Sequence, residues 1–257
     1  FVTAKIGPEA EVKGLSLGAV DYLTKPITPE IALQRVKTHI ALYDQQRALF
    51  SQVKEKTQEI NLGKLETLNI LGRAAEFKDN ETGMHVMRMS HYSKVIALAY
   101  GFCEQQADNL LHAAPMHDLG KIGIADSIML KPGKLTDEEF EIMKTHPQIG
   151  ADILGEDDSD LITLAKTVAL THHEKWNGTG YPKGLAAQEI PIEGRIVALA
   201  DVFDALRHKR CYKEPWSLED VIKEINSQQG KQFDPKLIEV FNQRVKEIED
   251  VLVRYPD

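Results

Sequence analysis

The pattern of apolar and polar positions divides the chain into three stretches. Residues 1 to about 30 hold short apolar runs on either side of a polar, helix-like segment, which predicts strand, helix, strand. From Pro29 to about Phe77 nearly every residue is a helix former, which predicts one or two long helices. From residue 78 onward, amphipathic segments are separated by turn sequences and little alternates like a strand. We therefore predict a mainly α chain, in which a partial α/β unit and a long helix precede an all-α domain.

The long helical stretch carries a weak heptad signal. Val36, Tyr43 and Phe50 fall seven residues apart, and Val53 and Ile60 follow on a neighbouring register. Two interpretations are equally open. The stretch is a linker helix that pairs with its copy in a homodimer, or it is a helix that packs on its own domain.

Two sequence signals indicate where helices of the all-α domain begin. In "KLTDEEFEIMKTH", Thr136 is the expected N-cap and Glu139, three residues later, completes a capping box. "WSLEDVIKEI" repeats the pattern with Ser217 and Asp220, whose acid is one carbon shorter than the usual Glu. We expect helices to start directly after Thr136 and Ser217.

Composition narrows the class of protein. The chain has 257 residues, 42% of them hydrophobic, which is enough for sizeable cores. The net charge of -8 argues against a general nucleic-acid or anionic-membrane binder, because such proteins need a summed positive field. Cys103 and Cys211 lie far apart, and no apolar run approaches the roughly 18 residues that a bilayer span requires, so we expect a reduced, cytoplasmic setting. The start at Phe1 indicates a remainder of something longer.

Histidines and carboxylates recur together in apolar, helix-like segments. They are Glu81 and His85, the doublet His117-Asp118, His146, the doublet His172-His173, and Asp201. Each alone has a structural explanation, since a lone His on an apolar face is usually a satisfied core residue. Five histidines and three carboxylates together match the ligand number of two or three divalent ions, and adjacent residues can hold different ions. Imidazole and carboxylate without thiolate favour Mn, Fe or Zn.

The first stretch resembles the C-terminal half of a bacterial response-regulator receiver domain. The resemblance rests on Thr3 after an apolar pair and on "DYLTKPI", with Lys25 and Pro26. It implies a switch Thr, an active-site Lys, a Lys-Pro bond that is usually cis, and a cognate sensor kinase as partner. The strand with the phospho-accepting Asp would lie before Phe1. The boundaries we expect are residues 1–44 for the receiver part, 45–64 for the linker helix and 65–257 for the all-α domain.

The all-α stretch resembles the HD-GYP phosphodiesterases, a branch of the HD metallohydrolase superfamily. "HDLGKIG", "HHEKWNGTGYP" and "ALADVFDAL" carry the resemblance, which covers residues from about 65 to 245. It implies that the metals are iron or manganese and that Glu81 provides for a third ion beside the usual two. The metal ligands that it implies are Glu81, His85, His117, Asp118, His146, His172, His173 and Asp201.

The resemblance also implies catalytic and substrate-binding residues. His117, Asp118 and Lys121 are the expected catalytic group, in which the Lys121 ammonium stabilises the developing phosphorane charge. Tyr181 of the Gly-Tyr-Pro loop is expected to line the substrate cleft. Arg210 and Lys213, in "RHKRCYKEPW", are the expected phosphate-contacting pair. Cys211 replaces a common proline here, and Arg207-His208 replaces small polar residues, which leaves the base preference open.

The ligand chemistry predicts metal-dependent phosphodiester hydrolysis, and the resemblance implies that the substrate is a cyclic dinucleotide, by default cyclic di-GMP, hydrolysed to the linear dinucleotide pGpG and then to GMP. Mixed 3'3'-cyclic GMP-AMP is the close alternative. A catalytically silent sensor would have lost metal ligands, and a generic HD nucleotidase would lack the Gly-Tyr-Pro loop. A transcriptional adaptor is disfavoured because no basic DNA-reading helix is present.

Overall fold

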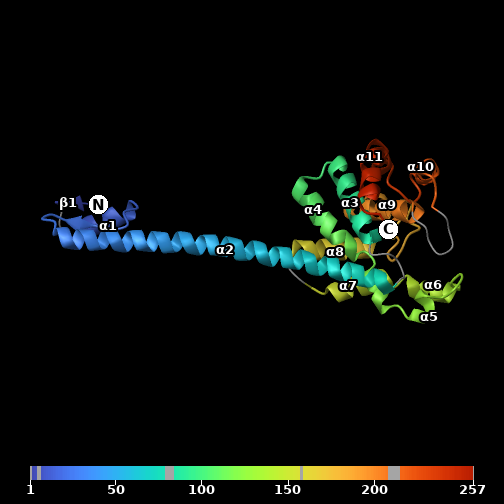
Figure 1. Cartoon of the computed structure of the whole chain (residues 1–257), viewed down its shortest axis with the longest axis horizontal. Helices are drawn as coiled ribbons and strands as arrows, with labels where there is room; N and C mark the ends of the chain where they lie inside the picture. The colour runs from blue at the N-terminus through green and yellow to red at the C-terminus, as the bar shows by residue number, and fades with distance from the viewer. Residues whose placement is uncertain (1, 5–6, 79–83, 157–158, 208–214, 257) are drawn as a thin grey trace. The chain divides into compact units, whose positions relative to one another are not determined.

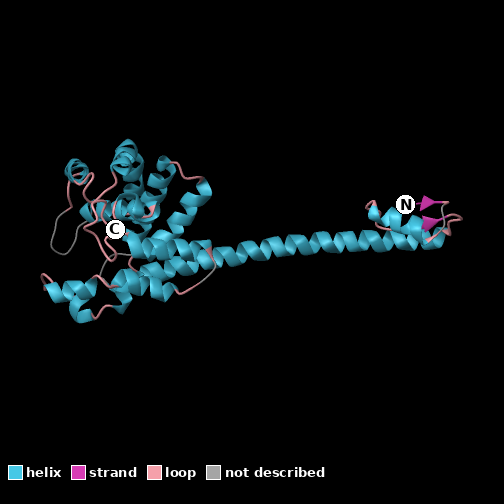
Figure 2. Cartoon of the chain, turned by 180° about the vertical axis from the view of Figure 1, so that it is seen from behind, coloured by secondary structure: helices cyan, strands magenta, loops and turns pink. Residues whose placement is uncertain are grey.

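The computed structural model describes residues 2–4, 7–78, 84–156, 159–207 and 215–256. The chain separates into two compact units, Phe1–Gly63 and Lys64–Asp257. Figure 2 shows that the described chain is helical apart from one short strand pair near the N-terminus. Among the described residues, no helix is both long and apolar enough to cross a bilayer.

The first unit contains the predicted order of strand, helix and strand in a minimal form. The strand β1 (Val2–Thr3) pairs in parallel with β2 (Leu23–Thr24), and α1 (Pro8–Ser16) connects them. The peptide bond between Lys25 and Pro26 is cis. With only two residues in each strand, an α/β receiver part is not evident in the described portion of this unit.

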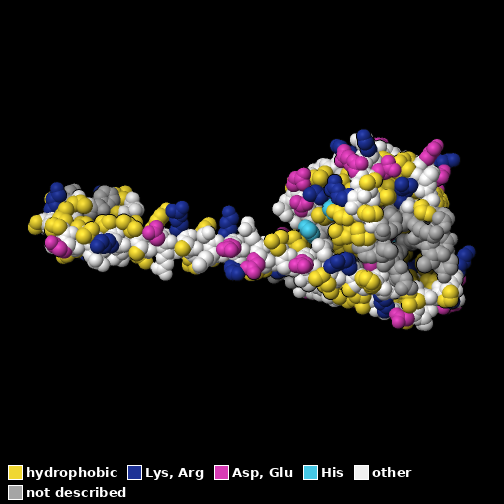
Figure 3. All heavy atoms as spheres, in the orientation of Figure 1, with side chains coloured by type: hydrophobic (Ala, Val, Ile, Leu, Met, Phe, Trp, Pro, Cys, Tyr) yellow, Lys and Arg dark blue, Asp and Glu magenta, His cyan; other side chains and the backbone are white. Residues whose placement is uncertain are grey.

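The helix α2 (Pro29–Lys78) is 50 residues long and extends on both sides of residues 45–64. Gly63 lies inside it without interrupting it, because one helical glycine costs only about 1 kcal/mol. The five heptad residues predicted above are exposed, with side chains between 52% and 74% accessible. Figure 3 shows apolar and charged side chains interspersed along this helix. The heptad stripe is therefore not buried within the chain.

The second unit is the predicted all-α domain. After α2 it contains α3 (Met84–Tyr100), α4 (Glu104–Ala113), the 3-10 helices η1 (Ala114–Met116) and η2 (Leu119–Gly123), α5 (Asp126–Met129), α6 (Asp137–Met143), α7 (His146–Leu154), α8 (Asp160–Thr171), η3 (Ala187–Glu189), α9 (Ile192–Arg207), α10 (Leu218–Ser227) and α11 (Pro235–Arg254). The helix α3 is central, because it packs against α4, α9 and α11 (Figure 1). Tyr92, Phe203 and Phe241 form a buried aromatic column through these helices, with ring centroids 5.2 and 5.4 Å apart.

Both predicted helix starts are confirmed. The Thr136 hydroxyl accepts the Glu139 N–H at 3.3 Å, and the Glu139 carboxylate accepts the Thr136 N–H at 2.7 Å, which is a complete capping box. At α10, the Ser217 hydroxyl accepts the Asp220 N–H at 3.1 Å but donates to the Asp220 carboxylate at 2.7 Å. The Asp220 side chain, one carbon shorter than Glu139, thus accepts from the Ser217 hydroxyl rather than from the Ser217 backbone N–H.

Candidate metal centre

Seven of the eight predicted ligands come together from distant parts of the chain, most of them at or beside the ends of helices. His85 lies in the first turn of α3, and Asp201 lies in α9. The doublet His117-Asp118 joins η1 to η2, and His146 begins α7. The remaining histidines, His172 and His173, directly follow α8.

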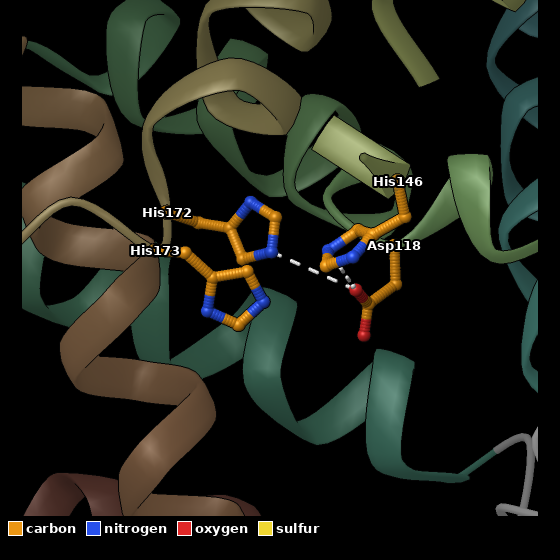
Figure 4. A group of neighbouring side chains, drawn as sticks. All are labelled: Asp118, His146, His172 and His173. Atoms are coloured by element: carbon orange, nitrogen blue, oxygen red, sulfur yellow. Dashed lines mark ion pairs between the residues drawn. The ribbon is translucent and has the colours of Figure 1, made fainter. Parts of the chain in front are cut away.

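The first cluster consists of one carboxylate and three imidazoles. Candidate ligand atoms of Asp118, His146, His172 and His173 all lie within 4.8 Å of one another (Figure 4). The Asp118 Oδ1 atom is 3.2 Å from Nε2 of His146 and 3.6 Å from Nε2 of His172. At this spacing all four side chains could coordinate a single ion.

The second cluster has its own carboxylate, Asp201, and also faces Asp118 of the first cluster. Ligand atoms of His85, His117 and Asp201 lie within 4.8 Å of one another, with the His85 Nε2 atom 3.5 Å from Asp201 Oδ1. The Asp118 Oδ2 atom is 3.1 Å from Nε2 of His117, while Oδ1 faces the first cluster. Asp118 can therefore bridge two ions.

The ring orientations fit metal binding. Nδ1 of His117, His146 and His172 lies 3.0, 2.8 and 3.0 Å from a backbone carbonyl, and a carbonyl can only accept, so Nδ1 carries the proton. Each Nε2 lone pair is thereby directed to the cluster. Within the described part of the chain, these three Nε2 atoms and Asp118 Oδ1 are buried without a hydrogen-bond partner. Such orphaned atoms are costly unless a cation occupies the space between them.

Electrostatics favour an anionic Asp118 and a neutral His173, whereas the Asp118 carboxylate draws positive charge toward His117. Burial would raise the pKa of Asp118, but Lys121 and His117 hold this pKa well below its usual range. Burial, reinforced by the neighbouring His172, sets the pKa of His173 well below its usual value. At His117 burial is outweighed by the Asp118 carboxylate, which raises the pKa, so the centre favours positive charge beside that ring. A divalent ion supplies that charge without a proton.

Close glycine packing holds the two halves of the first cluster together. A Cβ atom on Gly120 would lie 1.8 Å from the His146 carbonyl oxygen and 2.5 Å from the Gly150 nitrogen. Only glycine at position 120 lets η2 and α7 approach this closely. Gly120, the first glycine of "HDLGKIG", is therefore needed so that Asp118 can lie beside His146.

The Gly-Tyr-Pro loop folds back on His173. The Tyr181 ring stacks on the His173 ring at 4.6 Å between centroids, and the Tyr181 N–H donates to the His173 carbonyl at 3.2 Å. The buried Glu174 carboxylate accepts the N–H groups of Lys183 and Leu185 at 2.8 and 3.0 Å. The loop thus supports the metal centre through a ring contact and a carboxylate clamp.

The other predicted site residues divide into those that the structure describes and those outside it. Lys121 places its Nζ atom 2.8 Å from Asp118 Oδ2, one turn along η2. Glu81, Arg210 and Lys213 lie outside the described residues. Their roles stay predictions, as does the role of Tyr181 in the substrate cleft.

Three buried carboxylates near the centre were not predicted. Glu174 clamps the loop, Asp204 accepts a hydrogen bond from Nδ1 of His85 at 2.8 Å, and Glu76 Oε1 lies 3.9 Å from Nε2 of His85. Two of them could have been noticed in the sequence: Glu174 directly follows the doublet His172-His173, and Asp204 lies one helical turn after Asp201.

Helical packing around a histidine and aspartate centre defines residues 64–257 as a metal-binding helical domain. The HD domain family matches residues 69–237. A cyclic di-GMP phosphodiesterase of Thermotoga maritima is 42% identical over the whole chain, and the response regulator RpfG of Xanthomonas campestris, also a cyclic di-GMP phosphodiesterase, is 39% identical over 92% of it. The 3'3'-cGAMP-specific phosphodiesterase 2 of Vibrio cholerae is 46% identical over 73%. The chain spans 73%, 65% and 36% of these proteins, respectively.

The chain belongs to the HD domain family and, within it, to the HD-GYP proteins.

Proposed function

We propose that this protein is a metal-dependent phosphodiesterase that hydrolyses cyclic di-GMP, first to pGpG and then to GMP. The single observation that carries the proposal is the position of Asp118, whose two oxygens face two separate groups of buried imidazoles. A carboxylate that faces both groups can hold two ions close together, and two neighbouring ions can stabilise the attacking and leaving oxygens of a phosphodiester. The names of the Thermotoga and Xanthomonas relatives support the substrate.

The two clusters would each hold an ion, and Asp118 would bridge them. When bound, divalent ions act as Lewis acids on phosphoryl oxygens and lower the pKa of a water molecule. The chain fixes the imidazole orientations through the backbone carbonyl contacts and excludes bulk water by burial. The Lys121 ammonium, 2.8 Å from Asp118 Oδ2, stands beside the centre, where it can stabilise negative charge on the phosphoryl oxygens.

We propose iron or manganese as the metal, and three ions rather than two. Histidine and carboxylate donors without thiolate suit these metals. The two described clusters account for two ions, and Glu81, four residues before His85, is the candidate ligand for a third. Arg210 and Lys213 are the proposed contacts to the substrate phosphates, because they are basic residues concentrated in an acidic chain.

Cyclic GMP-AMP is the second candidate substrate. The specific observation in its favour is that the Vibrio protein specific for this nucleotide is 46% identical to the chain, as similar as the cyclic di-GMP phosphodiesterase of the same organism. Overall identity therefore does not choose between the two substrates.

The first test measures metal content and substrate choice together. Anaerobically purified protein is analysed for metals, and cyclic di-GMP and cyclic GMP-AMP are offered in competition with chromatographic detection of products. We expect two to three Fe or Mn per chain and consumption of cyclic di-GMP first. His117→Ala and Asp118→Ala are expected to abolish turnover while circular dichroism stays helical. Wild-type protein that binds either nucleotide but cleaves neither after Mn or Fe is restored would be a sensor instead.

We further propose that the N-terminal unit is the end of a receiver domain that receives signals from a sensor kinase, and that the protein works in the cytoplasm. The Xanthomonas relative is named a response regulator and matches 92% of the chain, which supports this assignment. Thr3, Lys25 and Pro26 are the residues that fit it. A phosphotransfer assay on a longer protein that includes the segment before Phe1 tests this assignment, with retention of phosphate by that longer protein as the expected result.

The exposed heptad stripe of α2 is proposed to pair with a second copy. Val36, Tyr43 and Phe50 are 52%, 65% and 74% exposed, and large apolar side chains at seven-residue spacing are typical of a coiled-coil seam. Phe50→Glu is expected to shift sedimentation from dimer to monomer. Leu62→Glu, at a 67% exposed residue off the stripe, is the matched control and is expected to leave the dimer intact. A wild-type monomer at all concentrations would refute the proposal.

A further inference from the structure

Asp204 is a buried carboxylate that the proposed reaction does not use. It lies in α9, one turn after Asp201, and is 1% exposed. Arg88 of α3, also 1% exposed, binds it bidentately, with Nε donating to Oδ1 at 2.9 Å and Nη2 donating to Oδ2 at 3.1 Å. Nδ1 of His85 lies 2.8 Å from the same Oδ2 atom. The bidentate guanidinium contact pairs the buried Asp204 carboxylate with a charge of opposite sign, so Asp204 accepts hydrogen bonds from both Arg88 and His85.

His85 differs from His117, His146 and His172 in what its Nδ1 contacts. Those three imidazoles follow a helical turn and donate Nδ1–H to a backbone carbonyl three residues earlier. His85 contacts a side chain instead. Among the described residues, the Asp204 carboxylate of α9 accepts from the Nδ1–H of His85.

We propose that Asp204 is a positioning residue for the second metal cluster, and that Arg88 holds Asp204 in place. The Asp204 carboxylate selects the Nδ1–H tautomer of His85 and turns its Nε2 lone pair toward Asp201, 3.5 Å away. A carboxylate behind a ligating imidazole also raises the basicity of that imidazole. The inference rests on metal binding in the proposed function, but not on the identity of the substrate.

The test replaces the pair by apolar residues. The double variant Arg88→Met/Asp204→Leu removes both charges, so that neither is left buried and unpaired. Its control is Arg195→Met/Asp234→Asn, which removes a second, largely buried Arg–Asp pair, with Arg195 Nη1 and Asp234 Oδ2 2.6 Å apart, and keeps the N-cap acceptor of α11. Mn²⁺ binding to metal-free protein is titrated by electron paramagnetic resonance, and Tm is measured by calorimetry.

We expect the Arg88→Met/Asp204→Leu variant to bind Mn²⁺ about 10–100-fold more weakly at one class of site, with the other class unchanged and the Tm close to wild type. The Arg195→Met/Asp234→Asn control is expected to keep wild-type Mn²⁺ binding. Wild-type affinity at every site in the first variant would show that the ion pair is only structural and would overturn the inference. The result is read from metal binding, so a failure of the proposed hydrolysis is seen separately in wild-type turnover.

A second measurement covers the case in which the variant does not fold. Nitrogen-15 spectra of the imidazoles in the wild-type protein report the tautomer of each histidine, and His85→Gln assigns the signal. We expect His85 to carry its proton on Nδ1. A proton on Nε2 in the metal-free protein at neutral pH would overturn the inference.

Discussion

Gly180→Ala tests how the Gly-Tyr-Pro loop supports the metal centre. A Cβ atom at this position would lie 2.4 Å from the Lys175 nitrogen, 2.5 Å from the Glu174 Cα and 2.6 Å from the His173 carbonyl oxygen. These are about 1 Å short of ordinary contact, and all three atoms belong to the backbone, so no flexible side chain can give way. The loop has to move by roughly this distance, away from the Tyr181 contacts to His173.

The expected cost follows from those contacts. Overpacking of this kind costs about 1–3 kcal/mol of folding stability. A displacement of about 1 Å near the reacting groups lowers turnover by about 10²-fold. Calorimetry measures the loss of stability and chromatographic product analysis the loss of turnover. Mn²⁺ titration is expected to show weaker metal binding as well, because the displaced loop no longer holds His173.

The matched control is Gly63→Ala, the same chemical change in α2 at a position where the added Cβ meets no atom within 4 Å. It is expected to leave activity unchanged and to stabilise the helix slightly, by up to about 1 kcal/mol. Gly180→Ala protein with wild-type Mn²⁺ affinity and turnover would refute the argument that the loop braces His173.

Three further predictions follow from buried groups. Glu174→Gln replaces one acceptor oxygen by an NH₂ group, so the N–H of either Lys183 or Leu185 loses its hydrogen-bond partner. Urea denaturation should show that the free energy of unfolding falls by about 1–3 kcal/mol. An unchanged urea midpoint would count against the role of Glu174 in holding the loop. Burial and the nearby Arg254 lower the pKa of His91 in the folded protein. As the pH falls below about 6.5, His91 therefore binds a proton in the unfolded chain before it does so in the folded protein, and the free energy of unfolding decreases. His91→Gln should flatten that fall in thermal scans from pH 7 to pH 5, and an equal slope in both proteins would contradict it. Removal of the metal by a chelator should lower the Tm. Mn²⁺ added at 100 times its Kd should then raise the free energy of unfolding by about 2.7 kcal/mol. A Tm that responds to neither treatment would argue against a metal in the buried clusters.

The sequence allowed the residues of the centre to be selected, because metal ligands are restricted to a few side-chain types. Histidines beside carboxylates in apolar segments are unusual enough that His117-Asp118 and His172-His173 stand out. The structure brings seven of the eight selected residues into two clusters, and Glu81 lies outside the described residues. The shared role of Asp118 could not be predicted, because it depends on where two distant helix ends meet.

The supporting carboxylates could not be found in the same way. Glu174 and Asp204 belong to the commonest surface residue types, and only burial and the direction of their partners distinguish them. The extent of α2 agrees with the prediction, because the run of helix formers from Pro29 to about Phe77 corresponds to the described helix Pro29–Lys78. The choice between one helix and two could not be made, since helix propensity alone does not show whether Gly63 or Gly72 interrupts the run. The predicted order of strand, helix and strand in residues 1–30 is present, but β1 and β2 pair over only two residues each, so the receiver assignment stays a proposal.

The placement of the histidines at helix ends links the fold to the centre. The last carbonyls of a helix have no partner within the helix and carry partial negative charge. His117, His146 and His172 each follow such an end, donate Nδ1–H to one of these carbonyls, and leave Nε2 for the cluster. One contact thus satisfies the helix terminus, selects the tautomer and directs negative helix ends toward a site for cations. A helical domain can therefore build this centre without a sheet, provided that its helices stop where the ions bind.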